Sequence, residues 1–281
     1  MPAKKNSSQP ASDASFNQSN KNVINYMMVG VLVVAAFVIG SLYQKVKYLE
    51  KGVTSVTGTA QTQGQQTADQ PAQVEPTVSI DSVRAAFSKS VIKFGNAKSK
   101  LVFIEIADPS CPFCGIASGK NKELNTDRFK LVEDGGTYVA PVVEMKKLVD
   151  SGKAAFAYLY TNGHGNGEMG TKAMYCAHEK GKFWAVHDLL MSSGGYKLLN
   201  DTVRNDKTKS GDIAQFLSSV IDADEMKKCL DSGKYDNRIQ EDTTIATGLG
   251  VSGTPGFFVN STKYSGAYSF KDMESSVKAA L

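Results

Sequence analysis

The fold is decided by the stretch KLVFIEIADPSCPFCG, residues 100–115. Residues 100–106 form a near-continuous apolar run, which is typical of strands covered on both faces. A Cys-Pro-Phe-Cys motif follows at positions 111–114, and residues 116–125 can be helical. The stretch therefore predicts a buried strand that leads directly into a helix, with two cysteines at the junction.

The position of Cys111 favours ionisation of its thiol, because unpaired amides and the helix dipole at a helix N-terminus stabilise an anion. Pro112 suits the first helical position, where its missing N–H would have no partner. Cys114 lies on the same helical turn, so the two cysteines can form a disulfide that is attacked at Cys111 and resolved by Cys114. The spacing predicts a redox-active pair.

Half of a metal site is the alternative interpretation of this motif. Zinc prefers four ligands, commonly two such pairs, whereas the other cysteines, Cys176 and Cys229, are far apart in the sequence. The histidines that could in principle complete a site are His164, His178 and His187. We expect the last two to be surface or hydrogen-bonded groups in a helical region, and the first to lie in a flexible glycine-rich loop. No metal is predicted.

Two further features favour redox chemistry. Glu105 stands inside the apolar strand, so we expect a partly buried carboxyl with a raised pKa that exchanges a proton with Cys114 directly or through water. A solvated carboxylate on an edge strand is the alternative. Thr254-Pro255 precedes a late apolar strand, residues 256–260, where a proline cannot donate a ladder hydrogen bond. Its peptide bond is either a cis bond that turns the chain or an ordinary trans turn.

The composition excludes several classes of protein. Of 281 residues, 41% are apolar and 21% charged, which excludes a wholly disordered or collagen-like chain. The 32 basic and 28 acidic residues give a net charge of +4 without a dense basic face, so we expect no nucleic-acid partner. Four cysteines are too few for a small disulfide-stapled scaffold.

The N-terminal part predicts a tail, an anchor and a linker. Residues 1–22 are mostly polar and are expected to be disordered. Residues 23–43 lie within 23 uncharged residues, which would span about 35 Å as a helix and could cross a bilayer. Residues 44–79, rich in Gly, Thr and Gln, predict a flexible linker. A cleaved signal peptide is the alternative to the anchor. Lysines flank the span equally, so the sequence alone leaves its orientation open.

Residues 80–281 predict a mixed α/β domain, because strands alternate with helices before a terminal hairpin and helix. Strands are expected at 91–94, 100–106, 155–160, 256–260 and 262–265. Helices are expected at 82–88, 142–150, 167–191, 212–220, 223–247 and 271–280. A long helical stretch therefore separates the third and fourth strands.

Together these features resemble the thioredoxin superfamily, and most closely its DsbA-like thiol-disulfide oxidoreductases. The similarity rests on the strand-CxxC-helix unit, on Glu105, on Thr254-Pro255 before residues 257–260, and on residues 174–190, which look like the helical insertion of that branch. The expected fold is a thioredoxin fold with a helical insertion at about 140–250, preceded by a single transmembrane helix and a flexible linker.

The resemblance implies a role for each matching residue. Cys111 would be the exposed nucleophile, Cys114 the buried resolving thiol, Glu105 the acidic residue beneath the site, and Pro255 a cis-proline packed against the disulfide. Pro112, Phe113 and Thr254 would contact the substrate, with the Thr254 backbone pairing with an extended peptide.

Pro112-Phe113 departs from the Pro-His of the best-known family member, and Phe113 cannot stabilise a thiolate as a histidine does. We therefore expect a less depressed Cys111 pKa and a less oxidising disulfide.

Some relatives also carry a second disulfide, which implies a structural Cys176–Cys229 bond; two buried, reduced cysteines are the alternative.

The sequence thus predicts an enzyme that forms disulfide bonds in exported, cysteine-containing proteins. By family analogy it acts outside the cytoplasm, on a single-pass membrane anchor with a cytoplasmic N-terminus, and is reoxidised by a quinone-linked, DsbB-like membrane partner. The redox group is the cysteine pair, so no cofactor is expected. The alternatives are a disulfide reductase or isomerase of the same fold, and a non-enzymatic metal- or peptide-binding module.

Overall fold

The computed structural model describes residues 78–281. The predicted tail and anchor, and all but the last two residues of the predicted linker, lie outside this range. Within residues 78–281, none of the helices has the length and apolar character needed to cross a bilayer.

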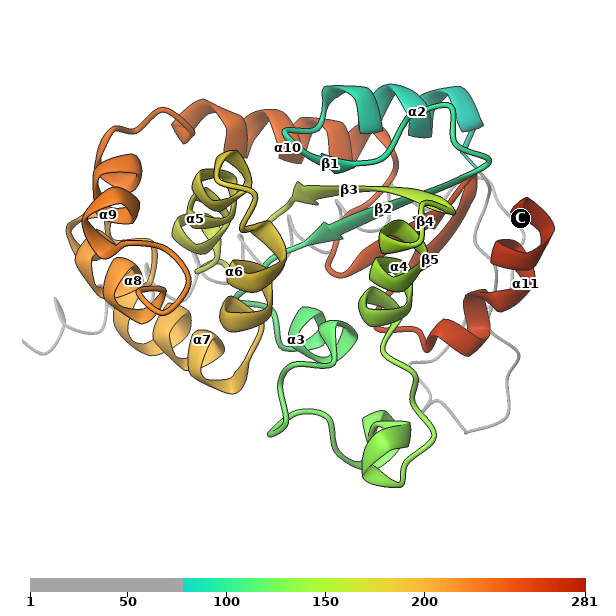
Figure 1. Cartoon of the computed structure of the whole chain (residues 1–281), viewed down its shortest axis with the longest axis horizontal. Coiled ribbons are helices and arrows are strands. Elements are labelled where there is room, and N and C mark those ends of the chain that lie inside the picture. Colours follow the sequence, from blue (N-terminus) through green and yellow to red (C-terminus); the bar gives the residue numbers. More distant parts are fainter. Residues whose placement is uncertain (1–77) are drawn as a thin grey trace, which may run out of the picture. The chain divides into compact units, whose positions relative to one another are not determined.

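A five-stranded sheet in the order β1-β3-β2-β4-β5 forms the centre of the described domain (Figure 1). The strands are β1 (Ile92–Phe94), β2 (Leu101–Ala107), β3 (Ala154–Tyr160), β4 (Gly256–Val259) and β5 (Thr262–Ser265). The pair β2 and β3 is parallel, and the other neighbours are antiparallel. Every residue of β2 is buried, as the apolar run predicted.

Helices cover both faces of the sheet. One face carries α2 (Ile80–Lys89) and α10 (Asp236–Gly248), and the other carries α3 (Pro112–Ser118), α4 (Pro141–Asp150) and α11 (Phe270–Ala280) (Figure 1). Alternate residues of a strand point to opposite faces. The residues of β2 that face α2 and α10 are Val102, Ile104 and Ile106. Glu105 therefore points to the other face, where the cysteine pair lies.

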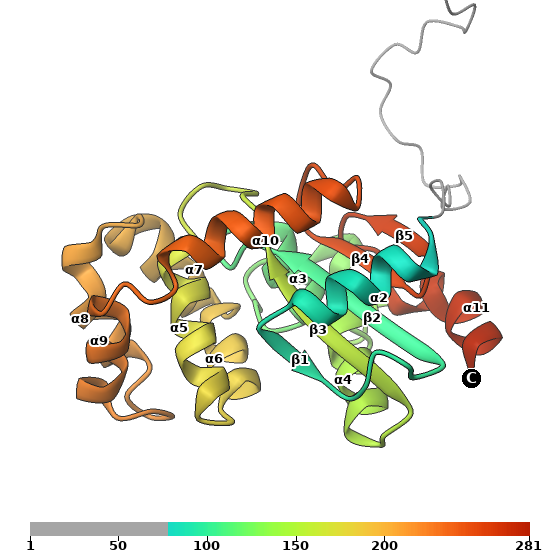
Figure 2. The same cartoon turned by 90° about the horizontal axis from the view of Figure 1, so that it is seen from above.

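A helical insertion between β3 and β4 packs at one end of the sheet (Figure 2). Besides α10 it contains α5 (Glu168–Glu179), α6 (Phe183–Leu190), α7 (Ser193–Lys197), α8 (Ser210–Phe216) and α9 (Ala223–Asp231). Short helical turns are η1 (Asp127–Phe129), η2 (Val132–Asp134), η3 (Leu198–Val203) and η4 (Lys207–Lys209). The insertion begins at Glu168, later than the predicted start near residue 140, because residues 141–150 form α4 before β3.

Three predicted helices differ from those observed, and each difference involves a glycine. The segments predicted as continuous helices at 167–191 and 223–247 are interrupted near Gly181 (φ +68°) and Gly233 (φ +66°). Helix α3 begins at Pro112 and ends before Gly119 (φ +69°), so the helix predicted at 116–125 stops early. Glycine adopts this left-handed conformation without a steric penalty and commonly ends a helix.

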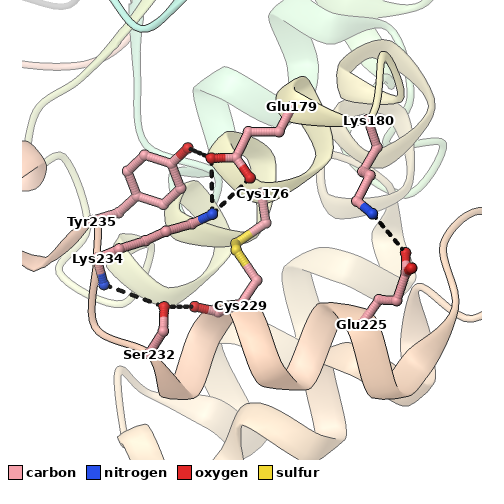
Figure 3. The surroundings of a disulfide bond; sticks show 8 residues. All are labelled: Cys176, Glu179, Lys180, Glu225, Cys229, Ser232, Lys234 and Tyr235. Carbon is pink, nitrogen blue, oxygen red and sulfur yellow. Dashed lines mark hydrogen bonds and ion pairs between the residues drawn. A yellow bond between two sulfur atoms is a disulfide. The ribbon is translucent and has the colours of Figure 1, made fainter.

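Cys176 of α5 and Cys229 of α9 form a disulfide, which confirms the predicted pairing. Figure 3 shows that ion pairs accompany the bond: Lys180, which follows α5, meets Glu225 of α9 at 3.1 Å, and Glu179 accepts a hydrogen bond from Lys234 at 2.6 Å. The disulfide and the Lys180–Glu225 ion pair therefore both link the C-terminal end of α5 to α9.

Candidate active site

Cys111 is the residue that precedes the first turn of α3, as the strand-CxxC-helix motif predicted. Its amide donates to the Asp108 carbonyl at 2.9 Å, and its own carbonyl accepts from the amides of Cys114 and Gly115. Pro112 takes the first helical position, where no N–H is needed. The backbone thus fixes the nucleophile at a helix start.

The Cys111 thiol has a pKa lowered from 9.0 to about 6. The main cause is a hydrogen bond from the Cys114 thiol. Burial opposes the shift, while the Thr254 side chain and the amides of Cys114 and Phe113 add to it. The amides are those expected at a helix N-terminus. At neutral pH the group is therefore mostly thiolate, the form that attacks disulfides.

Cys111 is less accessible than the predicted exposed nucleophile, since only 4% of the residue is exposed. The physical reason is its neighbour: the thiol lies 3.5 Å from the carbonyl oxygen of Thr254, in the segment that leads into β4. Phe113, 45% exposed, is the surface residue of the motif.

Cys114 is completely buried, as the resemblance implied for a resolving thiol. Burial is the main cause that raises its pKa well above 9.0, and the hydrogen bond it gives to Cys111 adds to the shift. The Asp108 amide donates to its sulfur at 3.5 Å. The two thiols of one motif therefore have opposite tendencies to ionise.

Glu105 is also completely buried, which excludes the solvated edge-strand alternative. Burial raises its pKa from 4.5 to about 7, while His187 lowers it and Asp188 raises it slightly. Among the described residues neither carboxyl oxygen has a hydrogen-bond partner. The structure thus shows the raised pKa that was expected, but no direct bond to Cys114.

The Thr254-Pro255 peptide is cis, which decides between the two predicted alternatives. A loop at residues 161–167 packs against it, because a side chain at Gly163 would overlap the Thr254 side chain. Position 163 therefore needs a glycine, because the backbone there lies too close to the Thr254 side chain for any other residue.

Sequence reasoning missed the role of Asp108. Its Oδ2 atom accepts from the amides of Gly163, His164 and Gly165 at 3.0, 2.9 and 3.3 Å. Its Oδ1 atom accepts from the amide and hydroxyl of Ser110 at 2.8 and 2.6 Å. The loop that was expected to be flexible is therefore tied to the turn before Cys111. An aspartate before a proline at a strand end is the signal that could have indicated such a turn.

The hydrogen-bonded alternative predicted for His187 is confirmed, but its position beside Glu105 was missed. It was expected at the surface or in a hydrogen bond, and the structure buries it completely in α6. Its Nε2 atom lies 3.9 Å from Glu105 Oε2, and its Nδ1 atom lies 3.1 Å from Asp188 Oδ1. The helical spacing of apolar residues could have indicated this burial, because His187 lies on the same face of α6 as Phe183, Val186 and Leu190, which are also buried.

One aromatic side chain, Phe129, packs against the exposed Phe113. Its ring meets Phe129 edge-on at 6.2 Å, and Phe129 meets Tyr138 in the same way at 5.4 Å. The Arg128 guanidinium lies 4.6 Å from the centre of the Phe129 ring. An apolar surface thus adjoins the nucleophile. Across residues 78–281, His, Cys, Asp and Glu side chains form no group of three or more suited to a metal ion.

Comparison with known protein families identifies part of the described domain. A family model described as thioredoxin matches residues 142–279. The fold of residues 78–281 is thioredoxin-like. Because the match begins after residue 114, the assignment of the cysteine pair to this fold rests on the structure.

Two solved structures share the fold of the thioredoxin-like domain. Oxidised BdbD from Bacillus subtilis is 15% identical, with a TM-score of 0.50 over 74% of this chain and 98% of that one. A cysteine-to-alanine variant of alpha-DsbA1 from Wolbachia pipientis is 17% identical, with a TM-score of 0.53 over 72% and 96%.

Curated relatives are longer than this chain. Na(+)/H(+) antiporter NhaA 3 from Salinispora tropica is 26% identical over 191 residues, which are 66% of this chain and 24% of that protein. NhaA 1 from Salinispora arenicola is 26% identical over 188 residues, with the same two shares. The chain therefore spans about a quarter of the length of the curated relatives it matches.

Proposed function

We propose that the thioredoxin-like domain is a thiol-disulfide oxidoreductase that acts through Cys111 and Cys114 and forms disulfide bonds in other proteins. The observation that carries the proposal is the contrast between the two thiols. The pKa of Cys111 is lowered to about 6, whereas that of Cys114 is raised well above its ordinary value. One sulfur is suited to attack and to leave, and the other is suited to hold a proton.

The exchange balances in two steps. A substrate thiolate attacks Cys111 Sγ of the oxidised pair, the Cys111–Cys114 bond breaks, and the leaving electron pair stays on the Cys114 sulfur, which takes up a proton. A second substrate thiolate then attacks the substrate sulfur of the mixed disulfide and releases Cys111 as a thiolate. Two substrate thiols are oxidised to a disulfide and the pair is reduced by two electrons.

The low pKa of Cys111 favours the oxidising direction. A stabilised thiolate favours the reduced pair, and therefore makes its disulfide a better oxidant. The value of about 6 lies between roughly 7 for thioredoxin and roughly 3.5 for DsbA. We expect a reduction potential between about −270 and −120 mV, the values of those two proteins. A potential at or below the lower value would favour the reductase alternative.

The surface around Cys111 fits an extended, partly apolar peptide. The Thr254 backbone lies beside the thiol and can pair with a substrate strand, and the exposed Phe113 offers an apolar contact next to it. Pro255 follows in the same segment. Cysteine-containing proteins in an extended conformation are the proposed substrates.

The proposed setting is the outer side of a membrane. Residues 23–43 would anchor the chain with residues 1–22 in the cytoplasm, and residues 44–79 would carry the domain away from the bilayer. The Cys176–Cys229 disulfide is a feature of proteins in oxidising compartments. Exported proteins would then be the substrates, and a quinone-linked membrane protein would take electrons from the reduced pair. No ion transport is proposed, since the alignment covers 24% of each antiporter.

The proposal is tested with the full chain and a reduced, unfolded test protein in a glutathione buffer. The wild type should accelerate disulfide formation, and Cys111→Ser should abolish the acceleration. Cys114→Ser should accumulate a mixed disulfide that is visible on a non-reducing gel. A Cys176→Ser, Cys229→Ser double variant is the control and should retain activity. Full activity of Cys111→Ser would contradict the proposal.

A further inference from the structure

A line of polar side chains leads from the buried sheet face that carries the cysteine pair to the surface. Glu105 Oε2 and His187 Nε2 are 3.9 Å apart, and both side chains are fully buried. His187 Nδ1 lies 3.1 Å from Asp188 Oδ1. Asp188 Oδ2 lies 2.7 Å from Lys120 Nζ, and these two side chains are 36% and 37% exposed. The line therefore connects a completely buried carboxyl with solvent.

The contacts define which nitrogen of His187 carries the proton. An ionised Asp188 can only accept, so Nδ1 of His187 must donate to it. Burial tends to raise the pKa of Asp188, but hydrogen bonds from His187 and Lys120 outweigh it and hold the pKa below 3.8. The carboxylate is therefore present at neutral pH. In the neutral imidazole the lone pair of Nε2 is then free to accept a proton from Glu105.

We propose that His187 and Asp188 form a proton relay that connects Glu105 with solvent while Cys114 loses or gains its proton. The inference rests on the proposed thiol-disulfide exchange and adds the route of the proton. The distance of 3.9 Å between Glu105 and His187 exceeds a hydrogen bond, so transfer requires the two side chains to approach by about 1 Å.

The relay balances the exchange reaction. When Cys114 attacks a mixed disulfide at Cys111, its thiol proton passes to the Glu105 carboxylate, directly or through water, and the leaving thiolate departs from Cys111. Glu105 then gives a proton to His187 Nε2, and Nδ1 releases its own proton through Asp188 to solvent, which leaves the hydrogen of the neutral ring on Nε2 until the reverse step returns it to Nδ1. In the opposite direction, the leaving Cys114 sulfur takes a proton from Glu105 and the relay replaces it.

Other groups near Glu105 offer no equivalent path. From β3, Tyr158 faces it, but burial raises the pKa of this phenol well above its ordinary value and its hydroxyl donates to the Ala107 carbonyl at 3.4 Å. From β4, the neighbour is Phe257, which has no titratable group. From α3, the titratable group is Cys114, the proton's source. The remaining groups are His187 and Asp188 of α6, and Lys120, which forms an ion pair with Asp188.

A purely structural role for His187 is the competing explanation. Its ring lies 5.5 Å from that of Phe183 and 5.7 Å from that of Trp184, so it also fills space in the core. Packing accounts for burial of the ring. Neither packing nor the charge of His187 predicts a slower proton transfer at pH values where Glu105 is already ionised, and this difference can be measured.

The experiment follows one step, the attack of Cys114 on a mixed disulfide. The reduced full chain is mixed rapidly with oxidised glutathione and quenched in acid, and mass spectrometry separates the Cys111–glutathione adduct from the Cys111–Cys114 disulfide. For the wild type the rate of the second step should rise with pH through a midpoint near 7, where Glu105 becomes a base. Glu105→Gln should remove this midpoint and slow the step on the order of 100-fold.

The two relay variants should move the midpoint in opposite directions. His187 lowers the pKa of Glu105 and Asp188 raises it, so His187→Gln should shift the midpoint up and Asp188→Asn should shift it down. Both should lower the rate above the midpoint, on the order of tenfold, because the proton has lost its route. His178→Gln is the matched control. It removes a histidine that also packs edge-on against Phe183, and it should change neither quantity.

Two outcomes would overturn the relay: rates above the midpoint in both variants equal to that of the wild type, or a loss of rate that is as large in His178→Gln. Should His187→Gln fail to fold, Asp188→Asn decides alone, since it changes a partly exposed side chain at constant size. If the wild type forms neither the glutathione adduct nor the internal disulfide, the proposed function itself has failed. A normal wild type with unchanged variants contradicts only the relay.

Discussion

The Cys111 thiol lies 3.5 Å from the backbone carbonyl of Thr254, a residue 143 positions later in the chain. In the reduced, protonated state the thiol donates to this oxygen. When Cys111 is joined to a substrate the thiol proton is absent, and the carbonyl becomes free to accept from the substrate backbone. The same oxygen can therefore serve the protonated thiol, at pH values below its pKa, and the bound peptide in turn.

The identity of residue 113 should tune the nucleophile. Phe113 is exposed, so Phe113→His can be accommodated, and an imidazolium beside the thiolate should lower the Cys111 pKa from about 6 to about 5 or below. The pH dependence of alkylation of the reduced protein measures this value. Phe113→Leu is the neutral control. A pKa that stays the same or rises in the histidine variant would show that residue 113 does not act on the thiolate.

Asp108 should hold the loop at residues 161–167 against the active site. Asp108→Asn replaces one carboxylate oxygen by a donor, so it loses hydrogen bonds to Ser110 or to the loop amides, at a cost of about 1–3 kcal/mol. Hydrogen exchange should become faster at the amides of Gly163 and Gly165. Unchanged protection of these amides in a folded variant would refute this role.

The Cys176–Cys229 disulfide should stabilise the domain without taking part in exchange. Its sequence separation of 53 gives at most about 4 kcal/mol in the chain-entropy description. We expect the double serine variant to lose up to this amount in urea unfolding and to retain its exchange rate. The Cys111→Ser, Cys114→Ser variant, which lacks the redox pair and keeps the structural bond, is the comparison. Equal unfolding free energies for the two variants would argue against a stabilising bond.

Burial of Glu105 should make stability depend on pH. Its folded-state pKa of about 7 exceeds the ordinary 4.5, so its stabilising contribution is complete below 4.5 and is lost as the pH rises through 7. The loss amounts to at most about 3 kcal/mol relative to Glu105→Gln. The unfolding free energy of both proteins should be measured in the oxidised state, where the cysteine pair does not titrate. A difference that is constant with pH would contradict the burial effect.

Local patterns in the sequence were sufficient for the sheet and for the nucleophile. The apolar run at residues 100–106 predicted β2, because a strand covered on both faces needs apolar side chains at every position. The Cys-Pro pair predicted the start of α3, since proline is favoured where no N–H is required. Each of these features depends on neighbouring residues only.

Features that depend on distant contacts were missed or only partly predicted. The accessibility of Cys111 depends on Thr254, and the role of Asp108 depends on a loop more than 50 residues later in the chain. His187 meets Glu105 only because α6 of the insertion packs on that face of the sheet. The helix ends at Gly181 and Gly233 depend on neighbouring residues. Apolar residues nevertheless continue at helical spacing across both glycines, so the sequence predicted continuous helices there.

The pH dependence of alkylation of the reduced, native protein by a small reagent tests the central claim most directly. With Cys176 and Cys229 joined, the first site to react should be Cys111, identified by mass spectrometry, and its rate should rise with a midpoint near 6. Failure of Cys111 to react, or a midpoint near the 9.0 of an ordinary thiol, would contradict the account of this residue as the ionised nucleophile.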